Sequence, residues 1–186
     1  MTGRIEKLKT NHDLEITWIH FPLHPDTPEE GRSLEELFAG RDYDIKAAQA
    51  QMMERMAAEG LPYGERTMTY NSRLAQEVGK WADTQPGGEV FHDAMFRAYF
   101  VATENISDPE VLVRQAEGAG LSGEAAREVI ESRSFKAAVD ADWKRSYQAG
   151  VTGVPTFVAG GYGLVGAQPY EMLEQLVVEA GKEAKA

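Results

Sequence analysis

The chain has 186 residues, of which 42% are hydrophobic, and its 30 acidic residues outweigh 19 basic ones to give a net charge of −11. This charge argues against a nucleic-acid or anionic-membrane surface, because both need clustered positive side chains. The sequence contains no cysteine, which excludes disulfides, thiolate catalysis and cysteine metal ligands within these residues. No apolar run reaches the roughly 20 residues of a membrane span, and no secretion signal is visible. We therefore expect a cytoplasmic protein with no membrane partner.

The first part of the chain predicts one strand between helical segments. Residues 4–9 have the spacing of a short amphipathic helix. Residues 14–21 alternate between apolar and polar side chains and predict a strand that enters the interior. The sequence Ser33-Leu34-Glu35-Glu36 has the spacing of a capping box and predicts a short helical turn. Residues 44–58 predict a helix that stops at Gly60.

A mainly helical block is predicted from residue 72 to residue 149, without strands. Its helix-start signals include Ser107-Asp108-Pro109-Glu110, which combines a capping box with an early proline, and Ser122. The predicted helices cover residues 72–83, 89–103, 109–119, 123–131 and 135–149.

The last part of the chain predicts a hairpin followed by a helix. Residues 155–159 and 162–165 are apolar and flank Gly160-Gly161, which is typical of a tight hairpin turn. Pro169 is expected to open a final helix whose Leu173, Leu176 and Val177 face inward.

The most informative motif is the sequence Gly150-Val151-Thr152-Gly153-Val154-Pro155-Thr156. Proline cannot donate to a β-ladder, so Pro155 belongs at the first residue of a strand. We expect the Val154–Pro155 bond to be cis, because ordered X-Pro bonds in tight turns are where that isomer occurs. The backbone of Val154 would then be exposed and able to pair with an extended peptide, with Thr152 and Gly153 shaping the surface. Thr152, Gly153, Val154 and Pro155 are therefore the predicted substrate-binding residues.

This loop resembles the cis-proline loop of the thioredoxin superfamily. The sequence Tyr162-Gly163-Leu164-Val165-Gly166-Ala167-Gln168-Pro169 resembles the ending of DsbA-family proteins of the FrnE type, and Trp81-Ala82, residues 96–100 and residues 106–112 resemble their inserted helical domain. The resemblance implies an α/β thioredoxin-like fold with a large inserted helical domain. It divides the chain into residues 1–71 and 150–186 of the thioredoxin-like part and residues 72–149 of the insertion.

The same resemblance implies thiol-disulfide exchange on protein or peptide substrates, with a thiol compound such as glutathione as another candidate partner. In the family a first strand runs into a Cys-Pro-Trp-Cys motif and then into a helix, and residues 3–8 resemble the continuation of that helix. We therefore expect the first strand and both thiols to be missing from these 186 residues, either because the start codon is set too late or because the protein is a redox-dead descendant. In both cases the chain as given is expected to be redox-inactive, with no catalytic residue. Residues 14–21 are then expected not to pair directly with residues 155–159.

Alternative functions are open on the sequence alone. The 2-hydroxychromene-2-carboxylate isomerases and kappa-type glutathione transferases share the fold, and a non-catalytic peptide-binding or chaperone-like protein would use the groove alone. Self-association into a homodimer is also left open.

Other motifs favour structural interpretations. The letters G-x-G-x-x-G at residues 161–166 fall in the predicted hairpin, without the helix that dinucleotide binding requires. His20 and His24 are separated by Pro22 and are not one helical turn apart, so no metal site is expected. No cofactor is implied. A set of methionine and aromatic side chains is interpreted mainly as core, with a substrate groove as the alternative; the set is Met52, Met53, Met56, Phe91, Met95, Phe96, Tyr99 and Phe100.

Overall fold

The computed structural model describes residues 2–183 and forms two compact units. The first, here called the hairpin unit, comprises Met1–Leu23 and Asp142–Ala186, and the second, here called the helical unit, comprises His24–Ala141. The division at residues 71 and 149 that the sequence suggests stays a prediction.

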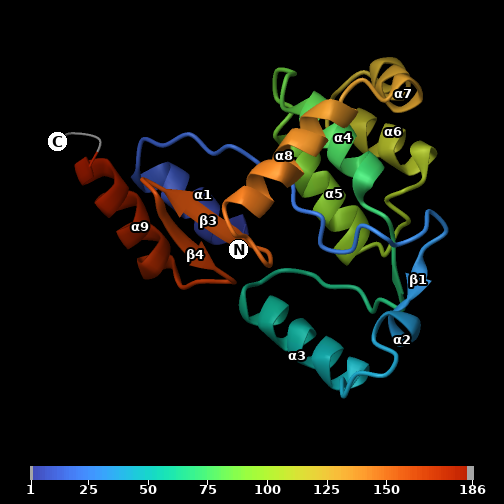
Figure 1. The fold of residues 1–186 in the computed structure, drawn as a ribbon, viewed down its shortest axis with the longest axis horizontal. Helices are drawn as coiled ribbons and strands as arrows, with labels where there is room; N and C mark the ends of the chain where they lie inside the picture. The colour runs from blue at the N-terminus through green and yellow to red at the C-terminus, as the bar shows by residue number, and fades with distance from the viewer. Residues whose placement is uncertain (1, 184–186) are drawn as a thin grey trace. The chain divides into compact units, whose positions relative to one another are not determined.

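The helical unit contains the helical block expected from the sequence (Figure 1). Its helices are α4 (Arg73–Ala82), α5 (Val90–Phe100), α6 (Pro109–Gly118), α7 (Gly123–Ser132) and part of α8 (Lys136–Gln148). No strand occurs between residues 72 and 149, which confirms the prediction for that span. Val78, Phe91 and Leu112 are completely buried in one apolar cluster to which α4, α5, α6 and α7 contribute. Burial of this kind is the main favourable term in folding.

The helix starts follow the capping signals with one correction. Ser122 caps α7 by accepting a hydrogen bond from the Ala125 N–H at 3.2 Å. At α6 the cap is Asp108, whose carboxylate accepts from the Glu110 N–H at 2.9 Å, and Pro109 follows as the first helical residue. The capping box that the sequence predicts from Ser107 is therefore not formed. The Ser107 hydroxyl instead donates to the backbone carbonyl of Glu29.

A small antiparallel ladder joins β1 (Arg32–Ser33) to β2 (Met68–Thr69) in the helical unit. Helix α2 (Leu34–Leu37) follows β1 and has the complete predicted capping box, with Ser33 and Glu36 each bonded to the other's backbone N–H. Helix α3 (Ile45–Ala58) has the expected bounds but buries none of its side chains. Strand β2 is not predicted from the sequence, because a two-residue strand leaves no periodic signal.

The hairpin unit contains the predicted hairpin and final helix (Figure 1). Strands β3 (Thr156–Ala159) and β4 (Tyr162–Val165) pair antiparallel across a two-residue turn, in which Gly160 and Gly161 have φ of +54° and +81°. Helix α9 (Tyr170–Glu183) contacts both strands and α1 (Thr2–Asn11). Leu173 of α9 and Leu8 of α1 are buried, and Leu176 and Val177 are half-buried.

The strand predicted over residues 14–21 is wrong. These residues form no ladder with any described residue, and β3 pairs only with β4 in the part of the chain that the structure describes. The alternating pattern is real at residues 14–17, where half-buried and exposed side chains alternate. A strand needs a hydrogen-bonded partner as well as a pattern, and no such partner lies beside this segment among residues 2–183. The expected absence of direct pairing between residues 14–21 and 155–159 is confirmed.

None of the described helices has the length and apolar character that crossing a lipid bilayer requires.

Candidate functional site

The loop that carries the predicted substrate-binding residues starts at the end of α8. Gly150 has a φ of +68°, and its N–H bonds to the Tyr147 carbonyl at 3.0 Å, while the Val151 N–H bonds to the Ser146 carbonyl at 3.0 Å. This arrangement is the usual way a glycine ends a helix and turns the chain away from its axis. The residues after it, Thr152 to Pro155, are thereby directed out of the helix toward β3.

The loop is fixed at its other end by the hairpin. The Val154–Pro155 bond is cis. The Thr156 hydroxyl donates to the Gly153 carbonyl at 2.7 Å, and the Gly166 N–H donates to the Pro155 carbonyl at 2.7 Å. Val154 is 53% exposed, Thr152 is exposed, and Gly153 and Pro155 are half-buried. The structure thus brings the four predicted residues together in one ordered loop with Val154 at its surface.

The hairpin register decides which backbone groups face outward. Pro155 faces Gly166 through a hydrogen bond, so Phe157 and Ala159 also point their backbone groups toward β4. By the same alternation Thr156 and Val158 point their N–H and C=O groups away from β4. Among the described residues no segment pairs with the side of β3 opposite to β4, so this side is an open edge, and Val154 lies at its end.

The segment before Leu23 is held to α8 by polar side chains. Asp142 accepts a hydrogen bond from the His20 N–H at 3.1 Å, and the Ser146 hydroxyl donates to the His20 carbonyl at 3.1 Å. Both side chains are buried, and they lie one helical turn apart on the same face of α8. They satisfy both backbone groups of residue 20, as a neighbouring strand would. These two hydrogen bonds, here called the His20 clip, were not predicted from the sequence. Two small polar residues spaced i, i+4 on a buried helix face could have indicated them.

Serine, histidine and aspartate therefore meet in this clip, but they do not form a catalytic triad. A triad needs the histidine ring between the hydroxyl and the carboxylate, whereas here both contacts are made to the backbone of His20. The arrangement is structural.

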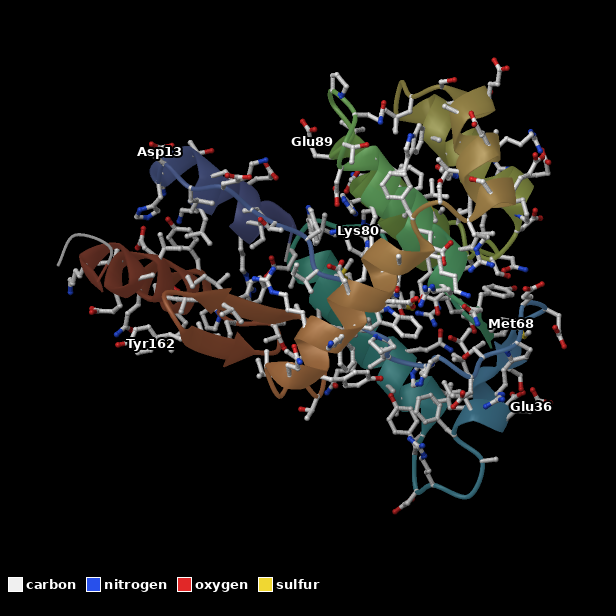
Figure 2. The ribbon with its side chains drawn as sticks, turned by 45° about the horizontal axis from the view of Figure 1, so that its top comes forward. Asp13, Glu36, Met68, Lys80, Glu89 and Tyr162 are labelled. Atoms are coloured by element: carbon white, nitrogen blue, oxygen red, sulfur yellow. The ribbon has the colours of Figure 1, made fainter. Side chains whose placement is uncertain are left out.

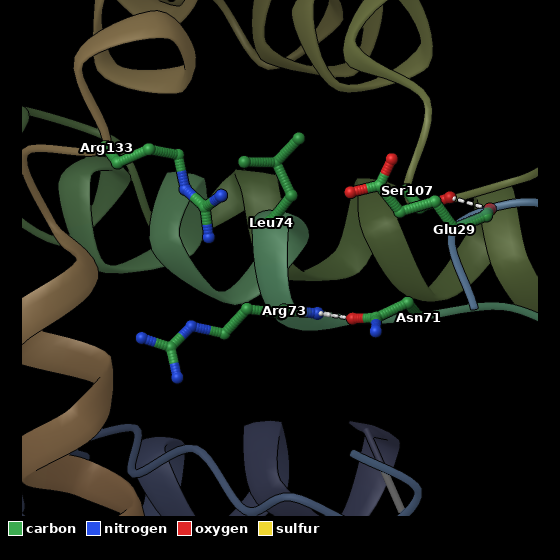
Figure 3. A pocket seen from close by; sticks show the side chains of 6 residues that line it. All are labelled: Glu29, Asn71, Arg73, Leu74, Ser107 and Arg133. Atoms are coloured by element: carbon green, nitrogen blue, oxygen red, sulfur yellow. Dashed lines mark hydrogen bonds between the residues drawn. The ribbon is translucent and has the colours of Figure 1, made fainter. Parts of the chain in front are cut away.

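A cavity of about 140 Å³ in the helical unit is lined in part by Arg73 and Arg133, whose guanidinium groups pair with a carboxylate outside the lining (Figure 3). Arg73 and Arg133 both donate to the fully buried Glu77, at 2.7–2.8 Å. Asn71 accepts from the Arg73 N–H at 2.8 Å. Burial raises the pKa of Glu77, but hydrogen bonds from Arg133 and Arg73 outweigh that effect and lower the pKa overall. The guanidinium groups are thus balanced by an internal carboxylate.

The remaining predicted motifs have structural positions. Residues 161–166 form the turn and β4, with no helix until Tyr170, as the hairpin interpretation required. No group of three or more histidine, aspartate or glutamate side chains placed to hold a metal ion occurs within residues 2–183. The methionine and aromatic set divides in two. Phe91, Met95 and Tyr99 belong to the helical core, whereas Met52, Met53 and Phe96 are exposed, so core packing explains only part of the set.

The mostly helical architecture, the β3–β4 hairpin and the proline loop together define a thioredoxin-like protein with a helical insertion. A model of the DSBA-like thioredoxin domain family matches residues 1–178, and the chain belongs to this family.

Two sequence relatives support the assignment. The crystal structure of a probable DsbA oxidoreductase from Streptomyces coelicolor is 30% identical, covers 98% of this chain and 83% of its own, and superposes with a TM-score of 0.86. The Uncharacterized protein YwbO of Bacillus subtilis (strain 168) is 24% identical over 172 residues, which are 92% of this chain and 84% of that protein.

A third relative shows the fold alone. A 2-hydroxychromene-2-carboxylate isomerase structure has a TM-score of 0.71 at 16% identity and covers 98% of this chain and 87% of its own. At this identity the likeness does not carry the isomerase reaction to this chain.

Proposed function

We propose that these residues supply the substrate-binding part of a FrnE-type DsbA-family protein, which engages extended protein or peptide segments at the loop from Thr152 to Pro155. The observation that carries the proposal is the exposed Val154 at the end of the open edge of β3. An extended peptide that pairs with such an edge gains main-chain hydrogen bonds without needing a particular sequence. Such binding suits a protein that handles many unfolded substrates.

The loop is preorganised for this role. The hydrogen bonds from Thr156 to Gly153 and from Gly166 to Pro155 fix it on both sides of Val154. A fixed loop loses little conformational entropy when a peptide binds. Exposed Val154, Val158 and Val165 add apolar surface next to the backbone groups.

Thiol-disulfide exchange is the reaction of the family resemblance, and it needs a thiolate. None of the 186 residues is cysteine. The chain as given is therefore proposed to bind substrates without oxidising or reducing them, in the cytoplasm. The function proposed for these residues is therefore peptide binding without catalysis.

Binding is tested with a thiol-free unfolded polypeptide, the carboxymethylated insulin B chain carrying a fluorescent label, by fluorescence anisotropy. Val154→Glu places a charge at the exposed end of the edge and is expected to weaken binding about tenfold. Val178→Glu is the matched control, because Val178 is 42% exposed on α9 and lies outside the loop. Equal affinity of the Val154 and Val178 variants would contradict the proposed site.

Insulin reduction by the purified chain, with dithiothreitol as reductant, separates binding from catalysis. The expected rate equals that of the blank without protein. Turnover clearly above the blank would show that the chemistry resides in a group other than a thiol.

A further inference from the structure

The hairpin has a second open edge, on the side of β4 that faces away from β3. Leu164 faces Phe157 in the hydrogen-bonded register, so its N–H and C=O groups point toward β3. By the same alternation the N–H and C=O groups of Gly163 point away from β3, and no segment within residues 2–183 pairs with this side of β4. The edge ends at Val165, whose carbonyl accepts a hydrogen bond from the Gln168 side-chain amide at 2.5 Å. The accessible part of this edge is therefore centred on Gly163.

A groove of about 410 Å³ lies beside this edge, between β4 and α9 of the hairpin unit. Besides Gly163, its lining residues are Tyr162, Leu164, Met172, Gln175, Leu176 and Glu179. Tyr162, which is labelled in Figure 2, is at the turn end of β4 and is 51% exposed. The four lining residues of α9 are spaced i, i+3, i+4 and i+7, which places them on one face of the helix. The groove thus joins an open strand edge to a helix face.

The apolar lining of the groove is adaptable. Leu164 and Leu176 are half-buried, and Met172 is 41% exposed. A methionine side chain is flexible and polarizable, so it adjusts to partners of different shapes. The backbone groups of Gly163 offer main-chain hydrogen bonds to an extended segment, and α9 offers a surface for every second side chain of that segment. Hydrogen bonds along an edge and a surface for alternate side chains are the two parts of peptide recognition by strand addition.

The polar rim of the groove is acidic. Glu179 lines the groove, and Glu171 is exposed and lies four residues before Gln175, as Glu179 lies four residues after it. Glu179 contacts Lys182 at 2.8 Å, but both side chains are exposed, so the pair contributes little and leaves the carboxylate accessible to a second cation. A basic side chain next to the bound segment is therefore favoured here.

The same charges disfavour a second copy of this chain as the partner. Pairing of β4 with β4 of another copy would bring two acidic α9 helices to one continuous sheet, and each chain has a net charge of −11. Like charges brought together across an interface cost free energy. A partner with basic side chains gains from the same electrostatic field.

We propose that the groove between β4 and α9 binds an extended peptide segment that carries apolar side chains next to basic ones. The segment adds a strand to the edge at Gly163, places apolar side chains against Met172 and Leu176, and directs a basic side chain to Glu179. This site is separate from the loop from Thr152 to Pro155 and goes beyond the function proposed for that loop.

The probe is a fluorescein-labelled peptide in which a run of leucines is flanked by lysines, and its binding to the whole chain is followed by fluorescence anisotropy. Saturable binding is expected, and a matched peptide with glutamates in place of the lysines is expected to bind about tenfold more weakly. Gly163→Pro removes the outward N–H and leaves the donors of the ladder with β3 in place, because proline is tolerated where the N–H faces away from the sheet. This variant is expected to weaken binding about tenfold.

A second variant tests the helix side of the groove. Met172→Lys places a positive charge inside the groove and is expected to weaken binding of the lysine-flanked peptide about tenfold. Val178→Lys is the matched control, because it adds the same charge to α9 at a position that is 42% exposed and outside the lining of the groove. This control is expected to bind within about twofold of the unmodified chain. Met172 is exposed, so this pair of variants decides the matter even if Gly163→Pro impairs folding.

Several results would overturn the site. One is binding of the lysine-flanked peptide no tighter than that of the glutamate-flanked peptide. Equal loss in the Met172 and Val178 variants would indicate attraction by overall charge only. Loss of binding with Val154→Glu but not with Met172→Lys would place the peptide at the proline loop, and the function proposed for that loop would stand. A dimer that Gly163→Pro converts into a monomer in sedimentation velocity would assign the edge to a second copy of the chain.

Discussion

The helical unit and the hairpin unit bury their apolar residues to very different extents. The helical unit has a contiguous core in which Val78, Phe91 and Leu112 have no exposed surface. The hairpin unit buries Leu8 and Leu173 but leaves many large apolar side chains exposed, which are Trp18, Leu23, Tyr147, Val154, Val158, Tyr162, Val165, Met172 and Val178. Contiguous helices can complete a core with neighbours in sequence, whereas a two-stranded hairpin has two open edges and a face that need other segments.

The two units also differ in what their polar and exposed groups do. The charged groups of the helical core, such as Glu77 with Arg73 and Arg133, are used for internal pairing. The exposed backbone and apolar groups of the hairpin unit are available to a partner. Substitutions in each unit test this contrast, and their expected effects on stability differ in size.

The largest effect is expected from paired truncations of fully buried leucines. Leu112→Ala in the helical core is expected to lower the free energy of unfolding by about 4 kcal/mol, and Leu173→Ala in the hairpin unit by about 2–3 kcal/mol. Leu112 belongs to a contiguous apolar cluster, whereas Leu173 lies in a unit that exposes many of its apolar side chains and is expected to relax around the lost atoms. Urea unfolding followed by circular dichroism measures both. A larger loss for Leu173→Ala would reverse the proposed contrast in packing.

A smaller effect is expected from the buried carboxylate. Glu77→Gln is expected to cost about 2–3 kcal/mol at neutral pH, because it removes the buried negative charge to which the guanidinium groups of Arg73 and Arg133 both donate. The pKa of Glu77 is lowered in the folded chain, so its contribution is present above the ordinary carboxyl value of 4.5 and is lost as the pH falls through the lowered value. The stability difference between the unmodified chain and the variant should therefore shrink in strong acid. Urea unfolding at neutral and acidic pH checks this, and a pH-independent difference would contradict the role of the charge.

The smallest effect is expected at the clip between α8 and His20. Asp142→Ala leaves the His20 N–H without its acceptor, at a cost of about 1–2 kcal/mol. The amide of His20 should then exchange its hydrogen about tenfold faster. Ser146→Ala is the control, because it removes the donor to the carbonyl and leaves the N–H bond intact. Equal acceleration in both variants would indicate general loosening of the segment.

Local signals made the helices predictable from the sequence. Asp44, Ser122 and the Ser33–Glu36 capping box each bond to backbone N–H groups within four residues. Their effect can therefore be predicted from neighbouring positions in the sequence. The hairpin was predictable for the same reason, since Gly160-Gly161 specifies the turn and the register. The loop at Pro155 was predictable because proline is tolerated at only a few positions of a strand, such as its first residue.

Non-local contacts were not predictable in this way. The ladder between Arg32 and Thr69 joins segments far apart in the chain and is only two residues long on each side. Residues 14–21 carry a strand pattern, but hydrogen-bond partners decide whether a strand forms.

The turn at Gly160 and Gly161 limits how the protein can be engineered. A Cβ on Gly160 would lie 2.8 Å from Ala180 of α9. Packing against α9 and the positive φ of Gly160 therefore both restrict this position to glycine. Inserting one residue here would shift β4 by one position and exchange its two faces, moving Leu164 to the side that Val165 now occupies. Peptide tags and library insertions at this turn are therefore expected to disrupt the hairpin and its packing against α9.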